Sequence, residues 1–87
     1  MSSEYSDLVN AGNSYAKKEE YDEAIDEYNK AIEIDPELMD GYNNRGLAYH
    51  NKGQYDKALS DLNKALEINP DYADAKKNRE HVLKRKQ

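Results

Sequence analysis

The feature that most constrains this chain is an internal repeat of thirty-four residues. When residues 5–38 are set above residues 39–72, the same residue types fall at the same places in both units. The identical pairs are Asn10/Asn44, Gly12/Gly46, Tyr15/Tyr49, Lys18/Lys52, Tyr21/Tyr55, Asp22/Asp56, Ala24/Ala58, Asn29/Asn63, Lys30/Lys64, Ala31/Ala65, Glu33/Glu67, Ile34/Ile68 and Pro36/Pro70. A fixed period of this length is typical of proteins that stack one supersecondary unit on the next.

Each unit predicts two helices. In the second half of each unit, apolar residues recur at spacings of three and four, which is the pattern of one buried stripe on a helix. The stripe comprises Ala24, Ile25, Tyr28, Ala31 and Ile32 in unit one, and Ala58, Leu59, Leu62, Ala65 and Leu66 in unit two. No segment shows the alternation of a strand, so we expect an all-α fold without a sheet.

The helix boundaries are also repeated. Asp22 and Asp56 stand before the two stripes, where a carboxylate can cap free backbone N–H groups. Gly53 suits the left-handed turn that ends a helix. Glu19 holds the equivalent place in unit one, so we expect a less well-formed turn there.

Each unit ends in a short polar residue followed by proline, at Asp35-Pro36 and Asn69-Pro70. Proline stops the incoming helix and suits the first position of the next one, with the preceding Asp or Asn as its N-cap. A fifth helix is therefore expected from near Pro70 toward Arg85.

Small residues and tyrosines are expected to fill the core together. Gly12, Gly46 and the repeated alanines allow antiparallel helices to approach closely. Because the chain has no Phe and no Trp, tyrosine is its only aromatic filler. We expect the hydroxyls of the interior tyrosines to point to the rim, where water can satisfy them; these are Tyr15, Tyr21, Tyr28, Tyr49 and Tyr55.

Composition excludes several classes of function. The chain has no cysteine, and its N-terminus shows no secretion signal, so we expect a cytoplasmic protein. No stretch approaches the roughly 20 apolar residues of a membrane span. The net charge of −5 disfavours nucleic acid as a partner.

The charge is unevenly spread along the chain. Residues 1–38 carry a net charge of −8 and residues 39–87 a net charge of +3. Such a division can steer a partner or drive head-to-tail self-association, making a homo-oligomer. A solvated helical surface is the simpler explanation, and we favour it.

No pattern of a catalytic or metal site is present. His50 and His81 are the only histidines, and two histidines without a nearby cysteine or carboxylate make a poor metal site. The acidic run at residues 19–23 lacks the glycine and ligand spacing of a calcium loop. The basic residues 84–86 suit the C-terminus of a helix. We therefore expect no enzyme activity, no cofactor and no bound metal.

The repeated residues resemble the tetratricopeptide repeat family. Unit one reads Leu8-x2-Ala11-Gly12-x2-Tyr15, Ala24-x3-Tyr28 and Pro36, and unit two reads Tyr42-x2-Arg45-Gly46-x2-Tyr49, Ala58-x3-Leu62 and Pro70. The resemblance implies an α-solenoid with a right-handed superhelical twist. It divides the single domain 1–87 into repeat one (5–38), repeat two (39–72) and a capping helix (71–86).

Two residues depart from the family pattern. Leu8 replaces a usual large aromatic residue, and Arg45 stands where leucine is common. We expect looser packing around both. Two repeats also fall short of the three that such stacks usually need, so either the capping helix or self-association must supply the missing interface.

The resemblance implies a concave groove lined by the first helix of each repeat and by the capping helix. The residues placed there are Val9, Asn10, Asn13, Lys17, Asn43, Asn44, Leu47, His50, Asn51, Lys77, Asn78 and His81. An amide side chain both donates and accepts, which suits gripping the backbone of an extended peptide. Alternatively, Asn10 and Asn44 only bridge neighbouring helices.

Family members that bind acidic chaperone tails hold the terminal carboxylate in a clamp of cations and amides. The corresponding places here are Val9, Asn13, Asn44, Asp74 and Asn78. The two amides are present but all three cations are missing, so a terminal carboxylate finds no charge partner. We expect weak or no binding to such tails.

The expected function is therefore a non-catalytic protein–protein interaction module that binds a peptide segment or a helix in its groove. The alternative is a structural or designed scaffold that self-associates and has no dedicated ligand.

Overall fold

The computed structural model describes residues 3–87, and within that range the chain forms five α-helices and no strand. The helices are α1 (Ser3–Lys17), α2 (Tyr21–Ile34), α3 (Met39–Asn51), α4 (Tyr55–Ile68) and α5 (Ala73–Lys86). The predicted all-α class, with two helices in each repeat and a fifth helix after them, is confirmed.

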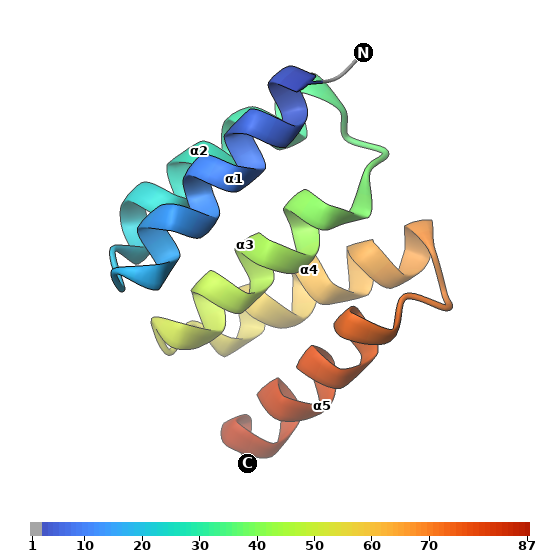
Figure 1. The fold of residues 1–87 in the computed structure, drawn as a ribbon. Coiled ribbons are helices and arrows are strands. Elements are labelled where there is room, and N and C mark those ends of the chain that lie inside the picture. The colour runs from blue at the N-terminus through green and yellow to red at the C-terminus, as the bar shows by residue number, and fades with distance from the viewer. Residues whose placement is uncertain (1–2) are drawn as a thin grey trace.

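Successive helices pack against each other in the order of the sequence. The helices α1 and α2 form one hairpin, α3 and α4 form the next, and α5 packs on α4. In Figure 1, α1, α3 and α5 run side by side on the near side of the molecule, with α2 and α4 behind them. The first helices of the two repeats and the fifth helix therefore share one face of the stack.

The core of repeat one depends on a glycine facing a tyrosine. Tyr28 in α2 is only 1% exposed and lies against α1. A Cβ atom added to Gly12 would stand 2.4 Å from Tyr28 Cε1, which is too close for any side chain. Because only glycine leaves room for this ring, the spacing of α1 and α2 is fixed by this pair.

The core of repeat two is completed by α5. Leu62 stands where repeat one has Tyr28, and it is fully buried. Ala75 and Val82 of α5 are also fully buried and belong to the same cluster. The capping helix thus supplies an interface to repeat two within the single chain.

The turns that join the helices of each hairpin have the same geometry in both repeats. Gly53 has a φ of +82° and Glu19 a φ of +62°. The following amides, of Gln54 and Glu20, each donate to a tyrosine carbonyl at 2.9 Å, that of Tyr49 and Tyr15 respectively. The expectation of a poorer turn at Glu19 is wrong, because the helix packing forces this residue into the left-handed region.

Replacing Glu19 by glycine should therefore stabilise the protein. A non-glycine residue in the left-handed region destabilises the folded state by roughly 1–2 kcal/mol, and glycine removes this strain. Glycine also has more conformational freedom in the unfolded chain, which offsets part of the stabilisation. We expect Glu19→Gly to raise the free energy of unfolding by about 0.5–1 kcal/mol, measured by urea denaturation.

Gly53→Ala is the matched control. An added Cβ at Gly53 would meet no atom within 4 Å, so any loss of stability reports the backbone conformation alone. A loss of about 1 kcal/mol is expected. Destabilisation by Glu19→Gly would contradict this account.

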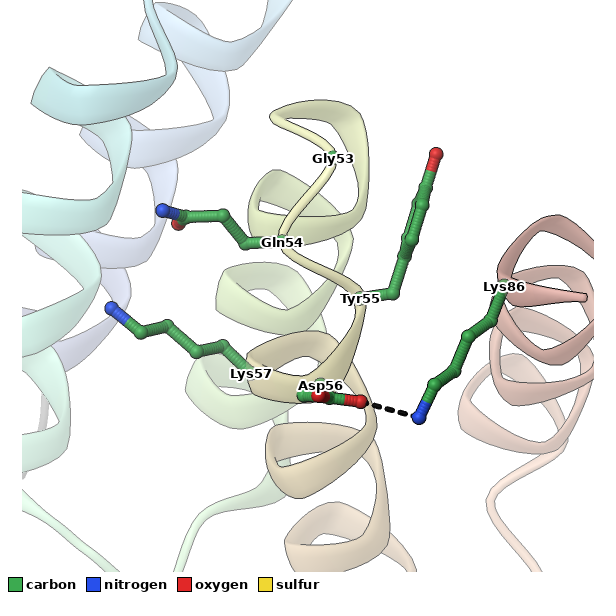
Figure 2. A pocket seen from close by; sticks show the side chains of 6 residues that line it. All are labelled: Gly53, Gln54, Tyr55, Asp56, Lys57 and Lys86. Atoms are coloured by element: carbon green, nitrogen blue, oxygen red, sulfur yellow. Dashed lines mark hydrogen bonds and ion pairs between the residues drawn. The ribbon is translucent and has the colours of Figure 1, made fainter.

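Asp22 and Asp56 join the repeats instead of capping helices. Both lie inside the first turn of α2 and α4, and the residues before these helices make no side-chain cap. Asp22 forms an ion pair with Lys52, and Asp56 Oδ1 lies 2.5 Å from Lys86 Nζ. Figure 2 shows the second pair spanning from α4 to α5. The capping prediction is wrong, because the helices begin one residue before these aspartates.

Pro36 and Pro70 lie in turns and not at the start of a helix. The amide of Leu38 donates to the carbonyl of Asp35 at 3.4 Å, which places Pro36 at the second position of a four-residue turn. The side-chain oxygen of Asp35 accepts from the amide of Glu37 at 3.0 Å, and Asn69 repeats the arrangement. The next helices begin at Met39 and Ala73, three residues later than the proline rule predicts.

Arg45 connects three helices. Its Nε and Nη2 donate to the two carboxylate oxygens of Asp61 in α4, at 2.8 and 2.7 Å, and its Nη1 donates to Asn29 Oδ1 in α2, at 2.8 Å. Asp61 is only 5% exposed. A two-pronged bond of this kind fixes both position and direction. The expectation of looser packing at Arg45 is wrong.

Candidate binding groove

A hollow of about 460 Å³ separates α1 from α3 on the face that these helices share. Its walls come from the second half of α1, from one residue of α2 and from residues 44–51 of α3. The lining residues are Asn13, Ala16, Lys17, Tyr28, Asn44, Leu47, Ala48 and Asn51. We call this hollow the α1–α3 groove. It brings together five of the residues predicted from the sequence, namely Asn13, Lys17, Asn44, Leu47 and Asn51.

Asn13 is held in place by the buried tyrosine. The hydroxyl of Tyr28 donates to Asn13 Oδ1 at 2.5 Å. The hydroxyl is protonated at neutral pH and acts as the donor, and burial raises the pKa of Tyr28 further, to about 12. Asn13 also lines the groove. The prediction that this tyrosine hydroxyl lies at a wet rim is wrong, because Asn13 satisfies it.

Asn44 is oriented by two other amides. Asn78 Nδ2 in α5 donates to Asn43 Oδ1 at 3.1 Å, and Asn43 Nδ2 approaches Asn44 Oδ1 at 3.5 Å. Asn43 is 5% exposed, so its role is to bridge α3 and α5. Asn44 is half-buried and lines the groove. The bridging role of Asn10 and Asn44 stays a prediction, whereas Asn43 does bridge two helices.

The rest of the groove combines an apolar floor with one cation. Ala16, Ala48 and the 37% exposed Leu47 give shallow apolar contact, and Lys17 and Asn51 are exposed. Two amide donors and an ammonium group are suited to a ligand that offers hydrogen-bond acceptors, such as main-chain carbonyls.

The other predicted groove residues lie elsewhere. Val9 is 9% exposed and belongs to the core of repeat one, so it presents little surface to a ligand. Asn10 is exposed on α1 but does not line the α1–α3 groove. Lys77 and His81 are exposed on α5 and do not line it either.

His50 lines a separate polar hollow of about 300 Å³, together with Asn51, Lys52, Gly53, Tyr55 and Arg85. Its ring packs edge-on against Tyr55, with the ring centres 5.6 Å apart. The Nδ1 atom is buried and has no hydrogen-bond partner among the described residues. Burial first, and then the nearby Arg85 and His81, lower the pKa of His50 below its usual 6.5.

This environment predicts a pH dependence of stability. Because the unfolded chain binds a proton at His50 more readily than the folded chain, the free energy of unfolding should fall as the pH drops below about 6.5 and through the lower folded pKa. His50→Gln should flatten the slope in this window, measured by urea denaturation at several pH values.

The cause can be tested separately by NMR titration of the His50 ring protons. Arg85→Gln removes one positive charge and should move the pKa of His50 upward toward 6.5. A pKa that does not move, or a slope that survives His50→Gln, would contradict the assignment.

Within residues 3–87, no group of three or more metal-ligating side chains comes together. No helix in that part of the chain is long and apolar enough to cross a membrane.

Some residues that line the groove were not predicted from the sequence. Tyr28 belongs to α2, and the repeat pattern assigns it to the core, yet it also supports Asn13. Ala16 and Ala48 look like ordinary packing residues. The bond between Arg45 and Asn29 does have a sign in the sequence, because Arg79 and Asn63 stand thirty-four residues after them. Arg79 and Asn63 form the same bond, at 3.0 Å.

The comparison with protein families gives two matches that together span most of the chain. A model described as TPR repeat matches residues 12–53, and a model described as Tetratricopeptide repeat matches residues 40–72. The chain belongs to the tetratricopeptide repeat family. The resemblance of the sequence motifs is confirmed, and the five helices are those of a tetratricopeptide α-solenoid.

Solved tetratricopeptide domains share this fold. The Sgt2 domain from Aspergillus fumigatus is 32% identical, with a TM-score of 0.90 over 93% of this chain and 54% of its own. The first domain of Spaghetti (RPAP3), bound to the HSP90 peptide SRMEEVD, is 35% identical, with a TM-score of 0.90 over 94% and 65%. The TPR2B domain of yeast Sti1, in a pHsp70 complex, is 27% identical, with a TM-score of 0.90 over 93% and 65%.

The tetratricopeptide chain described here therefore spans less than two thirds of the length of these solved chains. No curated protein sequence matches it.

Proposed function

We propose that this tetratricopeptide domain is a non-catalytic protein-interaction module whose α1–α3 groove binds an extended peptide segment. The observation that carries the proposal is the pair of amides at Asn13 and Asn44. The oxygen of each accepts a hydrogen bond from within the protein, and both residues line the same hollow. We infer that their Nδ2 groups serve as donors to a ligand there.

Structural neighbours support a peptide as the ligand. The first domain of Spaghetti is bound to an HSP90 peptide, and the TPR2B domain of yeast Sti1 forms a complex named with pHsp70. Both are more than 25% identical to this chain, and their folds match it over nearly its whole length.

The groove favours binding to the peptide backbone over reading of side chains. Amide donors pair with main-chain carbonyls of any sequence. The apolar floor at Leu47 and Ala48 is shallow, so it selects weakly among side chains. Lys17 adds attraction for an acidic residue. We infer a ligand that is extended, mildly acidic and held mainly through its carbonyl groups.

A displayed library of random peptides tests the groove directly. Selected peptides should shift the side-chain NH2 signals of Asn13 and Asn44 in NMR titrations. Replacing both residues by alanine should weaken the binding of a selected peptide about tenfold or more, because each lost hydrogen bond contributes about 0.5–1.5 kcal/mol.

The double variant needs a control for the loss of an asparagine side chain outside the groove. Asn10→Ala is suitable, since Asn10 is exposed on the same helix but does not line the groove. Peptides that shift only signals outside the groove would overturn the proposal. A self-associating scaffold without a ligand would yield no such peptides and would show dimers or larger species by light scattering.

The chaperone tails bound by the neighbours are a separate question. By resemblance, the places of the three clamp cations are Val9, Asp74 and Asn78. Val9 is buried, Asp74 is an exposed acid in the first turn of α5, and Asn78 is bonded to Asn43. We therefore propose that this groove rejects a free terminal carboxylate.

Titration with the peptide SRMEEVD tests this proposal. We expect no saturation below about 1 mM. Restoring two cations by Asp74→Lys and Asn78→Arg should improve the affinity at least tenfold, because charge-assisted bonds to carboxylate are about twice as strong as neutral ones.

A matched control adds the same positive charge elsewhere. Ser60→Lys with Glu67→Lys also changes the net charge by three, at exposed positions of α4. This control should leave binding of SRMEEVD unchanged. Micromolar affinity of the unmodified chain for this peptide would refute the proposed rejection.

A further inference from the structure

The fifth helix has one uncovered face. Its counterpart in repeat two is α3, and the corresponding face of α3 is covered by α4. In repeat two, α3 packs on the preceding α2 and also on its own hairpin partner α4. The helix α5 packs on α4 in the same way, but no sixth helix follows it within residues 3–87. The uncovered face holds a hollow of about 420 Å³, lined by Leu66, Pro70, Lys76, Arg79, Glu80 and Leu83. We call it the α5 hollow.

Three of the six residues that line the α5 hollow are apolar. Leu83 stands thirty-four residues after Tyr49, at the place where α3 contributes to the core, yet Leu83 is 45% exposed. Leu66 and Pro70 form the opposite wall. Such a surface is suited to the apolar edge of another helix.

Arg79 indicates that a helix bound in the α5 hollow should carry a negative charge. Its counterpart Arg45 binds Asn29 through Nη1 and uses Nε and Nη2 to grip the carboxylate of Asp61 in α4. Arg79 makes the first of these bonds, from Nη1 to Asn63 Oδ1 at 3.0 Å. Within the described part of the chain, Arg79 forms no ion pair like the one between Arg45 and Asp61. The two remaining nitrogens therefore lack the carboxylate that Asp61 provides to Arg45.

The charge of α5 agrees with an acidic partner. Its fourteen residues include six Lys or Arg and two acids. One of the acids, Glu80, lies in the hollow and offsets part of the charge of Lys76 and Arg79. The surface remains positive overall, which attracts an acidic segment during association.

We propose that the α5 hollow binds an acidic amphipathic helix of a partner protein. The helix lays an apolar edge against Leu66 and Leu83 and places one Asp or Glu on Nε and Nη2 of Arg79. It stands in for the second helix of a third hairpin. This surface is distinct from the α1–α3 groove and does not share a lining residue with it.

Glu80 sets how closely the partner helix approaches. It occupies the place of Gly46, where an added Cβ would come within 3.1 Å of Leu62 and 3.2 Å of the Ala58 carbonyl. A helix on α5 therefore lies farther out than α4 lies on α3. The partner helix then reaches the α5 hollow only through large apolar side chains, which lie next to the Asp or Glu that pairs with Arg79.

The chain itself supplies a probe of this kind. A peptide of residues 55–68 carries Leu62 beside Asp61, which is the pair that faces α3. Short helices are marginal in water, so a lactam bridge between positions 60 and 64, with Ser60→Glu in the peptide, holds it helical. Both positions are exposed in α4. Helicity is verified by circular dichroism before binding to the full chain is measured by fluorescence anisotropy.

We expect saturable binding that depends on the Arg79 pair. Arg79→Gln in the protein, and Asp61→Asn in the peptide, should each weaken binding about tenfold. The two changes together should weaken it no more than either alone, because they remove the same contact. Lys84→Gln removes an equal charge from an exposed position outside the hollow and should change affinity less than twofold.

Three outcomes would overturn the proposal. They are no binding of the bridged helical peptide, equal losses from Arg79→Gln and Lys84→Gln, and dimerisation of the chain that Arg79→Gln abolishes, since the occupant would then be a second copy. The Asn13/Asn44 double alanine variant should bind the peptide normally. Failure at this surface is thus distinguishable from failure of the α1–α3 groove.

Discussion

The close contact between Gly12 and Tyr28 is the constraint on which the rest of this structure depends. The ring of Tyr28 fills the space that any side chain at residue 12 would need, so α1 and α2 approach this closely only with glycine at residue 12. The same tyrosine donates its hydroxyl hydrogen bond to Asn13. One buried side chain therefore fixes both the geometry of the first hairpin and the orientation of a groove amide. Protein interiors are packed densely enough that such a contact cannot be adjusted locally.

Polar contacts then set how the repeats stack. Each hairpin is joined to the next helix by a lysine–aspartate pair and by an arginine–asparagine bond, and both occur twice at the period of the repeat. The lysine pairs are largely exposed and contribute little to stability. The Arg45–Asp61 pair is mostly buried and two-pronged, so it contributes direction as well as energy.

The two proposed surfaces differ in which of their polar atoms already have hydrogen-bond partners within the protein. In the α1–α3 groove, the oxygens of Asn13 and Asn44 accept hydrogen bonds from within the protein, and we infer that their Nδ2 groups remain as donors. In the α5 hollow, one nitrogen of Arg79 is occupied and the other two remain. Both surfaces therefore favour ligands rich in acceptors, but the first suits neutral carbonyls and the second a carboxylate. The acidic character of residues 1–38 leaves the positive potential concentrated toward α5.

The sequence by itself determined the number, order and pairing of the helices, because apolar periodicity and a thirty-four-residue repeat are properties of the chain read along its length. It also predicted that Asn13 and Asn44 share one face, and both line the α1–α3 groove. Only the tertiary structure decided where polar side chains find their partners. Asp22 and Asp56 bind lysines thirty residues away, Arg45 binds Asp61 and Asn29, and Val9 turns into the core. Such contacts depend on distances between helices, which local spacing does not specify. Glu19 shows the same limit in the backbone, since packing holds it in a conformation that its side chain disfavours.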